Sequence, residues 1–290
     1  MTAELTETIV NTLPKRKRKR TLPSPVGMIA FAVLALFGLL AVIGPWVAPF
    51  PPNELNVGGA ILGPSSEFLF GTDALGRDQF SRVLIAIRPA VIAATAATGF
   101  ALLVGTILGL IAGFWGGVVD GIVSRIIDFL FSIPEYLLAI LVLAILGRGL
   151  MNAAIAIGIV FIPRFARTVR SATQEIMSRN YISAARLSGR GKMWIMLRHV
   201  LPNITSPLIV IAAINLSMSS GAYAALSFLG FGVRPPNPDF GSMISDSLQY
   251  IGSDPWLIVP PAAVFVIFIL AINLAGDAIR DLLDPKTKGR

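Results

Sequence analysis

Four long stretches of this 290-residue sequence contain no charged side chain: 26–47, 89–119, 200–233 and 255–276. A helix needs roughly 20 apolar residues to cross the hydrocarbon core of a bilayer, so each stretch is long enough to do so. The whole chain is 54% hydrophobic and 14% charged, whereas soluble domains carry about 25% charged residues. We therefore predict that this chain lies in a membrane.

Six membrane-spanning helices are predicted for this all-α, polytopic chain. Two shorter apolar runs, 136–147 and 149–163, fit spans with polar residues near their ends. The predicted spans are 26–47, 89–114, 121–146, 151–165, 203–229 and 255–275. The second span is rich in small residues, which allow helices to pack closely in lipid: Ala93, Ala94, Ala97, Gly105, Gly109 and Gly113.

Positive charge gathers on one side of these spans. The run KRKRKR precedes the first span, eight of the 24 Lys and Arg residues fall within 164–198, and four more follow the last span. The loops on the other side, 49–88 and 234–254, hold four Lys or Arg residues and seven Asp or Glu residues. Lys and Arg are in excess on the cytoplasmic side of membrane proteins. Both termini and 164–198 are therefore predicted to be cytoplasmic, with KRKRKR resting on anionic lipid rather than on nucleic acid.

The chain divides into five predicted parts. These are a basic cytoplasmic tail (1–25), a first transmembrane helix (26–48), an extracytoplasmic loop with an amphipathic helix (49–88), a five-helix core that includes an inner segment at 164–202 (89–285), and a short cytoplasmic tail (286–290). The amphipathic helix is predicted near the end of the loop, where Phe80, Val83, Leu84 and Ile87 recur at helical spacing and Gln79 and Arg82 fall on the other side. We expect it to lie at the outer membrane surface, after a turn that Thr72 or Asp73 caps.

The sequence lacks the motifs that would make this chain an enzyme. It has no cysteine, which excludes disulfides, thiol catalysis and cysteine–metal sites. The nearest approach to a phosphate-binding loop is GRGKM at 189–193, but Met193 stands where Ser or Thr is needed and Arg186 where the first Gly is needed. His199 is the only histidine, and we expect it to be a structural or interface residue. The chain is therefore not expected to catalyse a reaction or to bind ATP, a metal or another cofactor.

A short polar helix is predicted inside the basic inner segment. Residues 180–188 can form two helical turns, which Gly189 can end by adopting a left-handed conformation. Ala184 and Ala185 give the helix a face of small side chains, which lets a partner approach closely. Pro202 can then begin the fifth span, where its missing N–H costs nothing. This helix could insert into a groove of another protein, and the alternative is a solvated loop held near anionic lipid.

The same segment resembles the inner-loop motif of ABC importer permeases. That motif reads E-A-A, three residues, Gly, nine residues, and then I-x-L-P. Here Ser183, Ala184 and Ala185 are followed at the same spacing by Gly189 and by the run HVLP, which comprises His199, Val200, Leu201 and Pro202. The run RHVLPN at 198–203 is similar to the version in peptide permeases. Two positions depart from the motif: His199 replaces Ile, and Ser183 replaces the Glu that helps to anchor the helix in the ATPase groove.

Further stretches are similar to the dipeptide/oligopeptide/nickel permease family. FGTDALGRDQFSR at 70–82 resembles the outer segment of one subunit type, and its matching residues are Gly71, Thr72, Asp73, Gly76, Arg77 and Asp78. GGVVD (116–120), RIIDFLFSIP (125–134), FGVRPPNPDFGSMISD (231–246) and NLAGDAIRDLLDP (273–285) also resemble family signatures. The resemblance covers nearly all of 26–285.

This resemblance implies an importer subunit with the type I ABC importer permease fold in the bacterial cytoplasmic (inner) membrane. A second, related permease would complete the pathway, and an extracytoplasmic substrate-binding protein would deliver peptide. Two ABC ATPase domains, which bind ATP and Mg, would dock on the inner helix through Ser183, Ala184, Ala185, Arg186, Gly189, His199, Leu201 and Pro202. Nickel or another small solute is the alternative substrate. A stand-alone channel or secondary transporter is the alternative of a different class, and the capped Ala-Ala helix argues against it.

Three residues of the third span are candidates for the pathway: Asp128, Pro134 and Glu135. For Asp128, we expect packing or gating rather than substrate contact. Glu135 is predicted to share the helical face of Asp128 and to lie deeper. A carboxylate at mid-bilayer costs roughly 2.5–3.5 kcal/mol, so Glu135 should either face the pathway or pair with a base in a neighbouring span. Pro134 is predicted to break the helix and to expose a carbonyl to the pathway.

Overall fold

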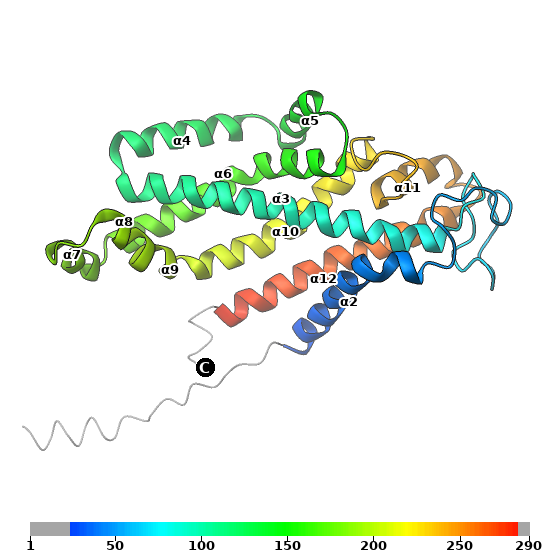
Figure 1. Ribbon diagram of the computed structural model, residues 1–290, viewed down its shortest axis with the longest axis horizontal. Coiled ribbons are helices and arrows are strands. Elements are labelled where there is room, and N and C mark those ends of the chain that lie inside the picture. Colours follow the sequence, from blue (N-terminus) through cyan, green and yellow to red (C-terminus); the bar gives the residue numbers. More distant parts are fainter. Residues whose placement is uncertain (1–23, 284–290) are drawn as a thin grey trace, which may run out of the picture.

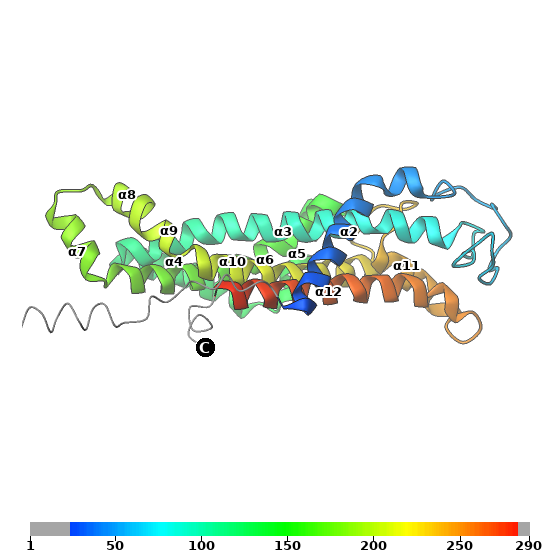
Figure 2. The ribbon, with the colours of Figure 1, turned by 90° about the horizontal axis from the view of Figure 1, so that it is seen from below.

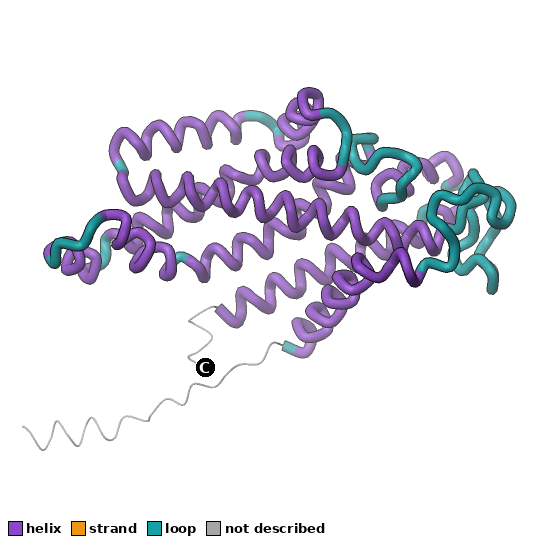
Figure 3. The backbone as a smooth tube through the Cα atoms, viewed as in Figure 1, coloured by secondary structure: helices purple, strands orange, loops and turns teal. Residues whose placement is uncertain are grey.

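The computed structural model describes residues 24–283, and the predicted basic tails lie outside this range. Apart from one isolated bridge between Thr72 and Asp78, the regular secondary structure of this part is helical. Its helices form an elongated bundle with two different ends (Figure 1). Residues 178–203 project at one end, which we call the basic end. Residues 48–78 and 229–258 gather at the other, the loop end, where most of the irregular chain lies (Figure 3).

Five helices of the described part are long and apolar enough to cross a membrane. They are α2 (Pro25–Val47), α3 (Gln79–Trp115), α6 (Leu150–Met177), α10 (Thr205–Phe228) and α12 (Val259–Leu283). They confirm the first, second, fourth, fifth and sixth predicted spans, although several bounds differ. The third span is a broken pair, so the described residues hold five spans, or six if the pair counts as one.

The third predicted span is not one straight helix. It consists of α4 (Gly117–Ser132) and α5 (Glu135–Leu146), which meet at an angle of 96°. Ile133 has an extended backbone, as expected of a residue before proline, and so it cannot continue α4 into α5. The expectation that Asp128 and Glu135 share one helical face is therefore wrong, because the two residues belong to different helices.

The amphipathic helix predicted at the membrane surface is instead the first part of α3. That helix starts at Gln79 and runs through Pro89 without ending. Gln79 and Arg82 do not face water, since they are only 1% and 4% exposed. Pro89 removes one backbone hydrogen bond, and packing against neighbouring segments keeps the helix continuous. The side chains of Gln79 and Arg82 are thus buried under the outer loops and do not contact lipid.

The predicted inner segment also begins inside a helix. α6 continues past the predicted limit of its span, through Pro163, to Met177. The first third of 164–202 is therefore a helical extension, and only the part after Met177 leaves the bundle. It forms α7 (Asn180–Leu187), α8 (Lys192–Ile195), a π-helical turn (Met196–Val200) and α9 (Leu201–Asn203). At the loop end, α11 (Phe240–Ser247) precedes two 3₁₀ turns, Leu248–Tyr250 and Pro255–Leu257.

The close packing predicted for the second span is present between α3 and α6. Gly105, Gly109 and Gly113 all face α6: a Cβ atom built on them would lie 2.5 Å from Phe165 Cβ, 2.5 Å from Ala166 O and 2.7 Å from Thr173 Cβ, respectively. Only a residue without a side chain lets the two backbones approach this closely. Together, α3 and α6 form the closely packed centre of the bundle.

The first and last helices form a second layer. In Figure 2, α2 crosses α12, and the rings of Phe37 and Phe268 meet at 5.0 Å between their centres. The start of α2 and the end of α12 both point toward the basic-end half of the bundle (Figure 1). The two helix ends thus lie on the side of α7, and the prediction for the termini themselves concerns residues outside the described range.

Candidate functional site: the basic end and the cavity at Glu135

The helix predicted at 180–188 is present as α7, and Gly189 ends it as predicted. Gly189 has φ +74°, a left-handed conformation that glycine adopts without strain. Its N–H donates to Arg186 O at 3.0 Å, and the N–H of Arg190 donates to Ala185 O at 3.3 Å. These two bonds are the Schellman pattern, in which the orphan carbonyls of the last turn are satisfied. The chain therefore turns back sharply after two turns of helix.

One side of α7 is fixed to the segment that follows it. Ile182 is fully buried. The ring of Tyr181 lies 6.1 Å from the ring of His199, which in turn meets the ring of Trp194 edge-on at 4.9 Å. His199 thus links α7 to the return segment, in agreement with a structural role. It stands where the resembled motif has Ile and fills that place with a ring.

The other side of α7 is open. Ser183, Ala184 and Arg186 are exposed, and Leu187 is 90% exposed at the tip. Several large apolar side chains of this end are exposed together: Tyr181, Leu187, Met193, Trp194 and Leu197. A gathering of exposed apolar side chains on a projecting element is typical of a contact surface. The geometry fits a helix that inserts into a partner.

The chain returns to the bundle through the π-helical turn. Leu201 donates its N–H to Met196 O, one residue further back than in an α-helix. Pro202 has no N–H to donate, and the side chain of Asn203 donates to His199 O at 2.6 Å. The long helix α10 then begins at Thr205. Pro202 therefore lies just before the fifth span rather than at its first turn.

Three ion pairs join α6 to the broken span. Three arginines recur on α6 at three-residue spacing, and each meets a carboxylate of α4 or α5: Arg164 with Glu135, Arg167 with Asp128, and Arg170 with Asp120. Sequence reasoning used these arginines only as markers of the cytoplasmic side. Their regular spacing on an extended helix, opposite a span with three carboxylates, was the signal that could have identified the pairs.

The place of Asp128 favours packing over substrate contact. Its carboxylate accepts from Arg167 at 2.6 Å, and the same guanidinium lies 4.1 Å from the centre of the Phe131 ring. An ion pair neutralises both charges and so lowers the cost of holding them near lipid. Asp128 is therefore held by α6 and does not line the cavity described next.

Glu135 pairs with a base and also lines a cavity. The cavity, of about 210 Å³, lies between α5, α6 and α10. Its wall is formed by Glu135, Tyr136, Ala139, Ile157, Val160, Phe161, Met218, Gly221, Ala222 and Leu226. The predicted pairing of Glu135 with a base of a neighbouring span is thus confirmed, and its facing the pathway stays a prediction. The Pro134 carbonyl is not free, because it accepts from Leu138 N–H at 3.0 Å.

The outer segment at 70–82 is an ordered cap on the bundle. Thr72 Oγ1 donates to Gly59 O at 2.6 Å and accepts from Leu62 N–H at 2.9 Å. Asp73 Oδ1 accepts from the N–H groups of Leu75 and Arg77 at 2.9 and 3.0 Å, so Asp73 caps a turn as predicted. Gly71 and Gly76 stand in the left-handed region where this turn begins and ends.

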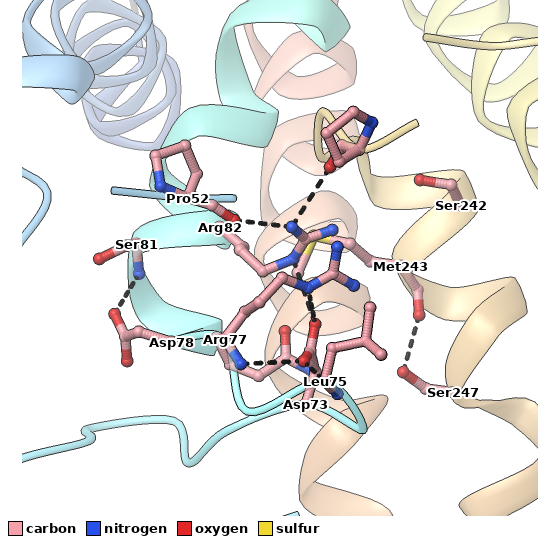
Figure 4. Close-up of polar contacts among 12 residues, drawn as sticks. Pro52, Asp73, Leu75, Arg77, Asp78, Ser81, Arg82, Ser242, Met243 and Ser247 are labelled. Carbon is pink, nitrogen blue, oxygen red and sulfur yellow. Dashed lines mark hydrogen bonds and ion pairs between the residues drawn. The ribbon is translucent and has the colours of Figure 1, made fainter. Parts of the chain in front are cut away.

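The N-cap of α3 is Asp78. Its Oδ2 accepts from Ser81 N–H at 2.8 Å (Figure 4). A carboxylate at this position satisfies an orphan backbone donor at the start of the helix and complements the positive end of the helix dipole. The sequence prediction placed capping only at Thr72 or Asp73 and so missed this cap.

Two buried arginines hold the outer segment in place (Figure 4). Arg77 Nε donates to Asp73 Oδ2 at 2.6 Å. Arg82 NH1 donates to Pro52 O at 2.7 Å and to Pro236 O at 3.4 Å, so a single side chain ties both outer loops to α3. Sequence reasoning placed Arg82 on a water-facing side and missed this role. An arginine within an apolar helical repeat was the available signal.

The second outer loop completes this cluster. Asn53 Nδ2 donates to Asn237 Oδ1 at 3.1 Å, a further bond between the two loops. Asp246 borders the same small hollow as Arg77 and Arg82. Partial desolvation of its carboxyl raises the pKa of Asp246, and the two arginines oppose that rise. The loop end is therefore a polar, cross-linked surface built from both outer loops.

Comparison with known proteins gives consistent results. Residues 105–289 match the family model described as binding-protein-dependent transport system inner membrane component. Residues 16–64 match the N-terminal TM domain of oligopeptide transport permease C. The di/tripeptide transport system permease protein DppC of Pseudomonas aeruginosa (strain UCBPP-PA14) is 39% identical over 269 residues, which cover 91% of this chain and 88% of that protein.

A second relative and a solved structure agree. The glutathione transport system permease protein GsiD of Escherichia coli O6:K15:H31 (strain 536 / UPEC) is 40% identical over 265 residues, covering 91% of this chain and 88% of that protein. An inward-facing structure of the MetNI methionine ABC transporter is similar with a TM-score of 0.57 at 24% sequence identity, covering 70% of this chain and 96% of that one. This likeness concerns the fold. The chain belongs to the family of binding-protein-dependent transport system inner membrane components, the permease subunits of ABC importers.

Proposed function

We propose that this permease forms one half of the pathway of an ATP-driven peptide importer. A second, related permease forms the other half, and two ABC ATPase subunits that bind ATP and Mg dock on the basic end. An extracytoplasmic binding protein delivers peptide to the loop end. In this proposal the basic end is cytoplasmic, in accord with the charge asymmetry of the sequence.

The observation that carries this proposal is the shape of α7. It is a short helix, capped by Gly189, fixed to the body of the protein on one side and open on the side of Ser183 and Ala184. A channel or a secondary transporter needs no such projecting element. Ser183 is exposed and can donate a hydrogen bond, so it can serve at the position of the motif's Glu.

The choice of peptides as substrate rests on the relatives. One is named for di- and tripeptides, and another for glutathione, which is itself a tripeptide. The substrate would pass along the face where α5, α6 and α10 surround the Glu135 cavity. Its volume of about 210 Å³ lies below the roughly 300–1,000 Å³ of complete ligand sites, as expected if a second permease supplies the rest.

Reconstitution tests the proposal. The chain would be purified together with its partner permease and ATPases and placed in liposomes, and the binding protein would be purified separately. We expect ATP hydrolysis to rise several-fold when the binding protein and a mixture of di- and tripeptides are added. Peptide should accumulate on the side of the membrane opposite to the binding protein. Stimulation by a nickel salt or another small solute, with no response to any peptide, would overturn the peptide assignment.

Cysteine labelling tests the orientation. The chain has no cysteine, so each introduced thiol reports one position. Ser188 and Asn237 are both exposed, at the basic end and the loop end respectively. We expect a membrane-impermeant thiol reagent to label Ser188→Cys only in inside-out vesicles and Asn237→Cys only in spheroplasts. Labelling of both sites from one side would contradict the proposed topology.

A further inference from the structure

Arg164 closes one edge of the Glu135 cavity. It touches three residues of the cavity wall: it pairs with Glu135, its NH1 lies 2.6 Å from Met218 Sδ, and its guanidinium carbon lies 4.9 Å from the centre of the Phe161 ring. The cavity therefore has two opposite charges side by side at its edge. The function proposed above gives no role to Arg164.

Both charged groups keep hydrogen-bonding capacity. Glu135 accepts from Arg164 through Oε1, and among residues 24–283 no hydrogen bond to its Oε2 is seen. Arg164 uses NH2 for Glu135 and NH1 for Met218, which leaves its Nε donor unused within the same range. Their side chains are 45% and 24% exposed. A second pair of opposite charges can therefore join the first without breaking it.

The apolar lining of the cavity makes binding depend on which charges the ligand carries. Apart from the Glu135 carboxylate and the Tyr136 hydroxyl, the side chains that line the cavity are apolar. Once a second permease covers this face, as proposed above, water becomes scarce there, charges interact strongly and an uncompensated charge is costly. A ligand with one charge would unbalance the neutral pair, whereas a ligand with both charges would extend it into an alternating cluster.

We propose that Arg164 and Glu135 form a subsite for zwitterions, in which Glu135 receives the ammonium group of a short peptide and Arg164 its carboxylate. This inference rests on the proposed function in that the peptide must pass the α5–α6–α10 face. The two ends of an extended dipeptide lie about 7 Å apart, so one dipeptide can reach both members of a contiguous pair. Arg164 and Glu135 are then specificity-determining residues inside the permease, in addition to any selection made by a binding protein.

Protection of a thiol in the cavity tests this subsite without the binding protein. Gly221 lines the cavity and has no atom within 4 Å of the place where a Cβ would stand, so a cysteine fits there. The Gly221→Cys chain would be purified in complex with its partner permease and ATPases and treated with a small thiol reagent. We expect diglycine to slow the modification about tenfold, and N-acetyl-diglycine and diglycine amide to slow it less than about twofold, because each lacks one charge.

Two double variants, each used as a further background for Gly221→Cys, distinguish a loss of peptide recognition from a loss of folding. In Glu135→Gln/Arg164→Gln no charge is left unpaired, so the complex should assemble, and protection by diglycine should disappear. In the matched control Asp128→Asn/Arg167→Gln, which removes a pair of the same kind away from the cavity wall, protection should persist. Equal protection by the blocked and the free peptides, protection that survives in the first background, or no protection in the unaltered complex would each overturn the subsite. Peptide-stimulated ATP hydrolysis that persists in such a case would show that the importer assignment still stands.

Discussion

Replacing Gly189 by proline is expected to abolish coupled transport, whereas the same replacement at Gly191 is expected to leave it nearly intact. Proline fixes φ near −65°, which cannot match the +74° of Gly189. It also removes the N–H that donates to Arg186 O at 3.0 Å. Gly191 has φ −65°, already the proline value, and its carbonyl bond to Ile195 N–H would remain. Two glycines that lie two residues apart should thus respond in opposite ways.

The measurement compares peptide uptake with ATP hydrolysis in reconstituted complexes. Because a left-handed residue costs about 1–2 kcal/mol for ordinary L-residues and proline cannot adopt it at all, we expect the Gly189→Pro segment to refold locally and uptake to fall by at least about tenfold. The ATPases should either be lost from the complex or hydrolyse ATP without responding to peptide. Normal, peptide-responsive transport by Gly189→Pro would show that the ending of α7 is irrelevant to coupling.

The sequence was sufficient to predict features that rest on local physics. Charge-free runs predicted the long helices, because lipid demands a continuous apolar helix. Gly189 predicted the end of α7, because the hydrogen bonds that end the helix join residues no more than five apart in sequence. The small residues of the second span predicted close packing, and Gly105, Gly109 and Gly113 do face α6.

Features that depend on distant partners could not be predicted in this way. The 96° turn between α4 and α5 is permitted by Pro134, but the direction of α5 follows from its packing on α6 and α10. Charge counting could not distinguish a solvated Arg164 from one paired with Glu135, since the partner comes from another helix 29 residues away in sequence. Arg82 likewise became internal because two loops, not water, cover that side of α3.

The same limit applies to the extension of α6. A positively charged run after a span is typical of a loop, yet Arg164, Arg167 and Arg170 continue the helix because each has a carboxylate opposite. This extension makes α6 one continuous helix from the Glu135 cavity to Met177, two residues short of α7. If ATPases dock on α7 as proposed above, a displacement passed from α7 to α6 would move Arg164 relative to α5 and so link the basic end to the proposed subsite.

A single added side chain should lower the yield of assembled complex most at the contact between α3 and α6. A Cβ on Gly109 would lie 2.5 Å from Ala166 O and 3.0 Å from Arg170 N, both backbone atoms of α6 that cannot swing aside. Gly109→Val should therefore force the helices apart. Overpacking of this kind costs about 1–3 kcal/mol or more, and here it would also strain the nearby Arg170–Asp120 pair.

Gly99 provides the matched control, because it lies on the same helix and has no atom within 4 Å of its Cβ position. Valine changes the helix propensity and the hydrophobicity of α3 equally at both positions. We expect Gly109→Val to lower the yield of assembled complex about tenfold or more, while Gly99→Val assembles normally. Trimming the neighbour in Gly109→Val/Val169→Gly, which removes the Val169 Cβ that would lie 2.7 Å away, should not restore assembly, since the nearest obstacle is the backbone carbonyl of Ala166. Recovery in that double variant would mean that side-chain crowding, and not the approach of the two backbones, sets the distance between α3 and α6.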